Sequence, residues 1–319
     1  MICAYVHSTW FLIISFVLLW NSGFIGAEYA LPYVQPFTLL FWRYWALSLI
    51  LMIYLVLRNR LHWPGLNAVL IALVVGILSH GVWLGCVAFS LQLGVPAGIV
   101  ALVVALQPMT TGALSGVIVG ERTPFYRWVG LVTGFIGVAI AVLFRTDITD
   151  ADSVFAYLLP FGSVAAITIA SLIQRKLEVK KHPCRLPIDA GLFYQSLGTA
   201  MVVTIPAIIA ENLTTSWQPA FFGSMLWLII GVSLGAYGLM WLLIGRMDAT
   251  RVASLFYLGP PVTMIMAWFA FGDKIHLTDI LGMIVVAVGI MITLMQTGGF
   301  FRTGSRTQQQ AAGKGKTGI

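Results

Sequence analysis

The stretch ALQPMTTGALSGVIVGER, from Ala105 to Arg122, has a counterpart later in the same chain. At an offset of 152 positions the sequence reads YLGPPVTMIMAWFAFGDK, from Tyr257 to Lys274. The two stretches share a proline, a threonine, a glycine and a closing acidic–basic pair in the same register: Pro108 with Pro260, Thr111 with Thr263, Gly120 with Gly272, Glu121 with Asp273, and Arg122 with Lys274. The same offset aligns Phe41 with Phe193, Ala97 with Ala249, and Gly130 with Gly282. The chain therefore contains an internal repeat.

The composition indicates that lipid surrounds most of this protein. Of its 319 residues, 59% are hydrophobic and only 9% are charged, and the mean hydropathy is +0.94. A soluble domain is about a quarter charged, so these few charges could not cover a water-facing surface. The three cysteines are scattered and odd in number, which gives neither a disulfide framework nor metal-ligand spacing. We therefore expect a membrane protein without a metal or another cofactor.

Ten segments are long and apolar enough to span a bilayer, which requires about 20 residues of helix. They lie at 10–30, 36–57, 66–91, 96–119, 125–144, 153–174, 188–210, 219–244, 251–272 and 277–297. The sequence thus predicts an all-α polytopic membrane protein with ten transmembrane helices. No cleavable signal is evident, because the first apolar run is too long for a signal peptide and lacks a clear cleavage site.

Basic residues mark one face of the membrane. With the N-terminus inside, the cytoplasmic connections and the tail hold fifteen lysines and arginines: Arg58, Arg60, Arg122, Arg127, Arg175, Lys176, Lys180, Lys181, Arg185, Arg246, Arg251, Arg302, Arg306, Lys314 and Lys316. The outer connections hold only Arg145 and Lys274. This asymmetry predicts an inner-membrane protein with both termini in the cytoplasm. It also explains the net charge of +7 without nucleic acid as a partner.

Each copy of the repeat contains five spans, so the two copies enter the membrane from opposite sides. We expect the first repeat at 1–145, the second at 153–297, and a polar, disordered tail at 298–319. Inverted repeats of this kind are typical of secondary transporters, whose substrate site lies near the bilayer midplane. Rocking one repeat against the other then exposes the site to each side in turn.

Several motifs resemble one transporter family. They are LLWNSGF in the first span, FWRYW in the second, QP and GER across the fourth, and GPP and GDK across the ninth. With these motifs the chain resembles the EamA group of the drug/metabolite transporter superfamily over residues 10–297. The resemblance implies ten helices in two five-helix repeats that move small metabolites, often outward. The second half departs from the pattern: LLPFGS replaces a Trp-Gly pair, and Gln195 stands where the first half has Arg43.

Arg43 is the first candidate for substrate binding. An ionisable group at the bilayer centre costs about 2.5–3.5 kcal/mol on insertion scales, and Arg43 falls within about 5 Å of the midplane at 1.5 Å rise per residue. Its planar guanidinium suits a carboxylate or a phosphate. The alternative is a structural ion pair with Glu28, which lies about 12 Å outward of the midplane and is also the candidate for proton coupling.

The other candidate substrate contacts are polar or aromatic residues inside spans. His80 could bind substrate or carry a proton, or it could bond a neighbouring helix. Asn21 and Gln107 could bond substrate, and the aromatic candidates for an apolar cavity are Trp20, Trp83 and Tyr257. Aromatic residues also form interface belts, so ordinary packing is the alternative for each.

Prolines near the midplane predict hinges. Pro108 breaks the helix geometry of the fourth span, and Gly259, Pro260 and Pro261 do so at the equivalent place in the ninth. Gly130, Gly134 and Gly137 give the fifth span a small-residue face that predicts close packing, within the monomer or across a homodimer.

The favoured function is export of a small organic metabolite, such as an amino acid or a related carboxylate, by alternating access. The alternatives are a flippase for lipid-linked substrates and a membrane-embedded enzyme. The enzyme would need an acid–base cluster at a membrane edge, and the longest basic connection, 175–187, offers only a histidine and Glu178.

Overall fold

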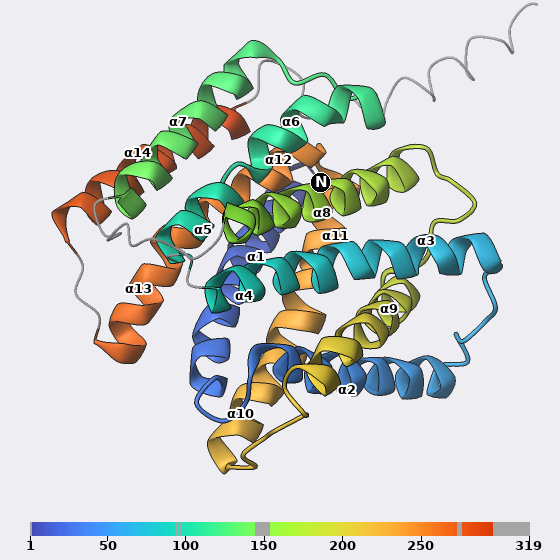
Figure 1. The fold of residues 1–319 in the computed structure, drawn as a ribbon. Coiled ribbons are helices and arrows are strands. Elements are labelled where there is room, and N and C mark those ends of the chain that lie inside the picture. The colour runs from blue at the N-terminus through green and yellow to red at the C-terminus, as the bar shows by residue number, and fades with distance from the viewer. Residues whose placement is uncertain (1, 94, 96, 144–153, 273–275, 296–319) are drawn as a thin grey trace, which may run out of the picture.

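A computed structural model describes residues 2–93, 95, 97–143, 154–272 and 276–295 (Figure 1). The described chain is helical throughout, in the order α1 (Ile2–Ala30), α2 (Pro36–Leu57), α3 (Leu66–Gly76), η1 (Ile77–Val82), α4 (Trp83–Gln92), α5 (Ala97–Val104), α6 (Gln107–Ile118), α7 (Phe125–Leu143), α8 (Val154–Val179), α9 (Ile188–Ile209), α10 (Pro219–Trp227), η2 (Leu228–Ala236), α11 (Tyr237–Arg246), α12 (Ala249–Ser254), η3 (Leu255–Leu258), α13 (Gly259–Phe271) and α14 (Leu277–Leu294). The tail predicted to be disordered, 298–319, lies outside the described residues.

The helices confirm an all-α polytopic membrane protein. In the described part of the chain, nine helical stretches are long and apolar enough to cross a membrane: Thr9–Ala30, Pro36–Leu57, Leu66–Ser90, Val100–Ile118, Phe155–Val179, Ile188–Ile209, Pro219–Arg246, Ala249–Phe271 and Leu277–Leu294. The remaining predicted span, 125–144, coincides with α7, whose described apolar part, Phe125–Ile140, is shorter. The described residues therefore contain nine candidate spans, and the count of ten remains a prediction.

Irregular helix segments recur at the repeat offset. The π-helix η1 lies in the third predicted span, and the equivalent positions, 229–234, lie inside the π-helix η2. The fourth span breaks between α5 and α6, and the ninth passes through the 3₁₀ turn η3 before α13. Gly120 and Gly272 both have positive φ, 87° and 76°, which L-residues with a side chain rarely adopt. The prolines predicted the breaks, whereas nothing in the sequence predicted the π-helices.

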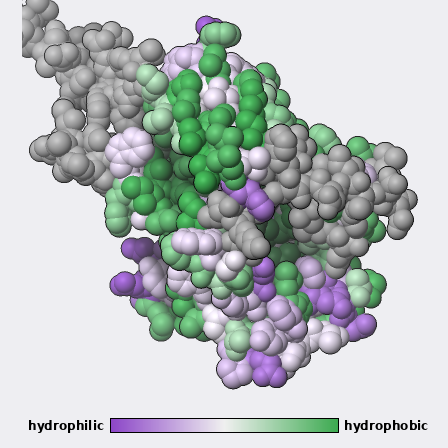
Figure 2. Space-filling model, turned by 90° about the vertical axis from the view of Figure 1, so that its left-hand side faces the viewer, coloured by the Kyte–Doolittle hydropathy of each residue, from purple (hydrophilic) through white to green (hydrophobic). Residues whose placement is uncertain are grey.

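Helices α7 and α14 lie side by side at the upper left of Figure 1, because glycines remove the side chains between them. A Cβ on Gly137 would lie 2.8 Å from the Gly282 carbonyl oxygen. A Cβ on Gly130 would lie 2.7 Å from the Gly289 carbonyl oxygen. The glycine face of α7 therefore packs against α14 within the monomer, which is one of the two arrangements that the sequence predicted. Apolar side chains cover the upper part of this side of the molecule in Figure 2, as a lipid-facing surface requires.

The connections gather at two ends of the bundle. At the first end, the connection after α1 meets the one after α9, through an isolated bridge between Val34 and Thr215. There the buried Glu211 accepts bonds from the first backbone N–H groups of α2, at 3.0 Å from Phe37 and 2.6 Å from Thr38. The connections after α2, α6, α8 and α11 meet at the other end, where the basic residues lie. We call these the Glu211 end and the basic end.

Candidate functional site

A cavity of about 420 Å³ opens between the helices of the first half and the middle of the eighth span. Its lining comes from α1, α2, α4, η2 and α11 and comprises Trp20, Gly23, Phe24, Ala27, Leu31, Pro36, Leu39, Leu40, Arg43, Trp83, Leu84, Val87, Ala88, Val232 and Tyr237. Arg43 is the one charged residue in this lining. A mostly apolar cavity of this size with few polar groups is typical of small-molecule sites.

The cavity runs from the middle of the bundle to the Glu211 end. Along α1 its wall extends from Trp20 to Leu31, which is about 16 Å at 1.5 Å per residue. On α2 it extends from Pro36, at the start of that helix, to Arg43. The lining therefore extends from the middle of the bundle to the connection between the first two spans, where Leu31 and Pro36 lie.

Arg43 is buried, with 6% of its surface exposed. Its Nε donates a hydrogen bond of 2.7 Å to Ser233 Oγ in η2, and its guanidinium lies 5.5 Å from the ring centroid of Tyr44. Within the described chain the Arg43 side chain makes no other hydrogen bond and no ion pair. Both terminal Nη groups are therefore free of bonds to described residues, and no carboxylate in the described part of the chain pairs with this charge.

Trp20 is at the centre of an aromatic cluster at the deep end of the cavity. Its ring centroid lies 5.4 Å from that of Trp83, 4.7 Å from Tyr237 and 4.9 Å from Phe256. Phe16 packs against both Trp20 and Phe256. These rings close the cavity on its inner side and leave Arg43 as its polar group.

His80 lies in η1, beside the cavity and outside its lining. Its ring centroid is 3.9 Å from that of Tyr237 and 5.3 Å from that of Tyr44. Neither ring nitrogen of His80 makes a well-aligned hydrogen bond with a described residue, although Gln195 of α9 lies close enough to interact with the ring. The Tyr237 hydroxyl donates instead to the Ser79 carbonyl at 3.2 Å. π-Helical segments are frequent at functional sites, and this one supports the cavity wall at Tyr237.

Asn21 and Gln107 lie next to the broken helices rather than in the cavity. Asn21 Oδ1 accepts a bond of 3.2 Å from Thr263 in α13, and its Nδ2 donates to the Val17 carbonyl. Gln107 Nε2 donates to Thr111 within α6 at 3.2 Å. Pro108 follows the break before α6, and Gly259, Pro260 and Pro261 begin α13. Asn21 thus joins the first span to the hinge predicted in the ninth.

Tyr257 and Glu28 also lie away from the lining. Tyr257 is 1% exposed and packs with the core between α7 and α14. Glu28 is exposed, and the ion pairs of the described residues include none between Arg43 and Glu28. Among the described residues Ser233, and not Glu28, holds the guanidinium of Arg43, so the ion pair considered for Arg43 is not formed in this structure.

The sequence led to three of the lining residues, Trp20, Arg43 and Trp83. It did not predict the contact between Arg43 and Ser233, because a serine in an apolar span does not indicate which residue it bonds. The small residues of the wall, Gly23 and Ala27, are four apart on α1 and suggest a concave helix face, but the same spacing also suits helix packing.

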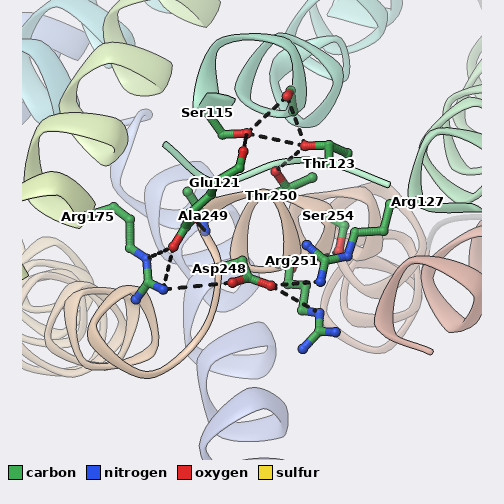
Figure 3. A network of polar contacts seen from close by, with 11 residues as sticks. Ser115, Glu121, Thr123, Arg127, Arg175, Asp248, Ala249, Thr250, Arg251 and Ser254 are labelled. Carbon is green, nitrogen blue, oxygen red and sulfur yellow. Dashed lines mark hydrogen bonds and ion pairs between the residues drawn. The ribbon is translucent and has the colours of Figure 1, made fainter. Parts of the chain in front are cut away.

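The basic end is closed by a network of charges, which Figure 3 shows. Arg175 of α8 pairs with Glu121 at 2.6 Å, and Arg127 of α7 pairs with Asp248 at 2.8 Å. Glu121 also accepts a bond of 3.2 Å from the backbone N–H of Ala249, at the start of α12. Glu121, which belongs to the first half of the chain, thus caps a helix of the second half.

Comparison with known proteins places the chain among transporters. It is 24% identical over 306 residues to the uncharacterized transporter YvbV of Bacillus subtilis (strain 168), covering 93% of this chain and 92% of the relative. It is 22% identical over 212 residues to a probable amino-acid metabolite efflux pump of Salmonella typhimurium (strain LT2), covering 64% and 70%. It is 30% identical over 183 residues to an S-adenosylmethionine uptake transporter of Rickettsia prowazekii (strain Madrid E), covering 56% of each chain.

A solved crystal structure has the same fold, with a TM-score of 0.75 at 18% identity, over 90% of this chain and 96% of that one. The model of the EamA-like transporter family matches residues 7–143 and again residues 154–295. These two matches cover nearly the whole chain, and the named relatives are transporters and not enzymes. The chain therefore belongs to the EamA-like transporter family.

Proposed function

We propose that this transporter exports a small organic metabolite, an amino acid or a related carboxylate, by alternating access. The observation that carries the proposal is the buried Arg43, which lines the cavity with its Nη groups free of described partners. A buried charge without a partner is costly, so a ligand that supplies an anion gains from pairing with it. The guanidinium presents two parallel donors, which fit a carboxylate.

The conformation supports an alternating-access mechanism. We infer that the cavity opens at the Glu211 end, because its lining reaches Leu31 and Pro36 there, while ion pairs between the two halves hold the basic end together. The positive-inside rule makes the basic end cytoplasmic, so this conformation is open to the outside. Recurrent helix breaks at the repeat offset support two inverted five-helix repeats, at 1–145 and 153–297.

The proposed direction is outward, which agrees with the relative named as an amino-acid metabolite efflux pump. The relative named as an uptake transporter has the opposite direction, so direction has to be measured on this chain. Metabolite profiling of cells with and without overexpression, inside and in the medium, measures cargo and direction together. We expect one carboxylate pool to move from the cells to the medium.

Arg43→Gln is the decisive variant. We expect it to abolish this movement at an unchanged protein level, because it removes the only charge in the lining. Arg58→Gln is the matched control, since Arg58 is exposed at the basic end, and its export should equal that of the wild type. Normal export by Arg43→Gln would end the binding role of Arg43. A change confined to lipid-linked products would favour the flippase alternative.

A further inference from the structure

We propose that the cavity selects carboxylates that carry no ammonium group: organic monoanions with an apolar, preferably aromatic, body. This inference rests on the proposed function and narrows its substrate class. A free amino acid brings one negative and one positive charge into the site. The lining supplies a partner for the first of these charges only.

The described lining of the cavity carries a positive charge and no negative one. Among the described residues of the lining, Arg43 is the one group with a permanent charge, and none of them is an aspartate, glutamate, asparagine or glutamine. Guanidinium nitrogens are donors only, so they bind acceptors and repel an ammonium. A monoanion leaves the occupied site neutral, whereas a zwitterion leaves an unpaired cation beside Arg43.

The described lining offers an ammonium only one hydroxyl oxygen as an acceptor. That oxygen belongs to Tyr237, which donates to the Ser79 carbonyl and can still accept one neutral bond. The His80 ring lies beside Tyr237 but outside the lining, and Asn21 Oδ1 is bonded to Thr263 in the ninth span. Glu28 is exposed and does not belong to the lining. An ammonium would lose its water in this cavity and gain at most one neutral acceptor, which is unfavourable.

The aromatic residues do not replace the missing acceptor. A cation can bind the open face of a tryptophan, but Trp20 is surrounded by the rings of Phe16, Trp83, Tyr237 and Phe256 at 4.7 to 5.5 Å. Phe24, Leu39, Leu40 and Val87 complete a wall of apolar side chains. This surface suits the apolar body of a ligand whose carboxylate lies on Arg43.

A matched pair of ligands tests the inference on the purified full-length chain. 3-Phenylpropanoate and phenylalanine share a phenyl ring and a carboxylate, and only phenylalanine carries an ammonium. Quenching of tryptophan fluorescence reports binding, since Trp20 and Trp83 line the cavity. We expect 3-phenylpropanoate to bind about tenfold or more tightly, because the ammonium is left without acceptors. Arg43→Gln should abolish its binding, and Glu28→Gln should leave the preference unchanged.

The outcomes separate the two proposals. Equal or tighter binding of phenylalanine would overturn the selectivity and leave a carboxylate transporter in place. Loss of phenylalanine binding in Glu28→Gln would also overturn it, because the ammonium would then have found its acceptor at the mouth of the cavity. Failure of both ligands to bind the folded wild-type chain would overturn the carboxylate transporter itself.

Discussion

Arg43 shows what the sequence can and cannot predict about a single residue. A charge in an apolar span must have a reason, so its position alone identified it as a candidate. Its partner could not be identified this way, because Ser233 lies 190 positions away and serine is common in such spans. Glu28 was the more obvious partner by charge, yet it is exposed. The sequence thus identified Arg43 as a candidate binding group, whereas the residue that holds its guanidinium came only from the structure.

The bond from Arg43 to Ser233 fixes the guanidinium in the cavity, so Ser233→Ala should disturb binding more than folding. We expect about three- to tenfold weaker binding of the transported carboxylate, which corresponds to one hydrogen bond of about 1 kcal/mol. Titration of the purified variant measures this change. Ser224→Ala is the control, because Ser224 is exposed and bonds only within its own helix. Equal affinities of the two variants would show that Ser233 does not position Arg43.

At the scale of the helix, hydropathy and the positions of the prolines predicted most of the helical spans and their breaks. The nine spans agree with their predicted positions to within a few residues, and the breaks near Pro108 and Pro260 are where the prolines predicted them. Hydropathy does not depend on which backbone hydrogen bonds form, so it could not predict that η1 and η2 are π-helices. His80 and Ser233 lie in these two segments, which is why their neighbours could not be derived from an ideal helix.

The glycine contact between α7 and α14 allows a direct test of helix packing. Gly130→Ala adds a Cβ that would lie 2.7 Å from the Gly289 carbonyl oxygen, so the helices must separate. We expect it to destabilise the fold by about 1–3 kcal/mol, the usual cost of overpacking. The measurement is thermal unfolding in detergent. Gly223→Ala is the matched control: its Cβ meets nothing within 4 Å in α10, so higher helix propensity should leave stability equal or raise it. Equal melting temperatures would contradict the close contact.

At the scale of the whole molecule, the two halves hold each other at both ends by different means. Glu211 of the second half caps α2 of the first at the cavity mouth. Glu121 of the first half caps α12 of the second at the basic end and is neutralised by Arg175. The charge count predicted which residues share a face of the membrane, but the pairing between halves depends on the tertiary fold. The repeat predicts that the halves move relative to each other, and these contacts join the halves at both ends.

The ion pairs at the basic end lead to a prediction about the conformational equilibrium. If the pair between Arg175 and Glu121 stabilises the conformation that opens at the Glu211 end, its loss must favour the opposite one. A single cysteine at Ala27, in a chain without Cys3, Cys86 and Cys184, reports access to the cavity. We expect an impermeant maleimide added outside intact cells to label it. Arg175→Gln should slow labelling about threefold or more, since the pair is largely shielded from water and loss of one partner is costly.

Arg60→Gln controls for the mere loss of a charge at the basic end. Arg60 pairs with Asp189 at 3.2 Å, but its side chain is 63% exposed, so this pair contributes little to stability. Labelling at Ala27→Cys should therefore proceed at the original rate. A rate unchanged by Arg175→Gln as well would show that the network only stabilises the fold. Labelling from the cytoplasmic side alone would reverse the proposed orientation, because Ala27 lies on the wall that leads to the cavity mouth.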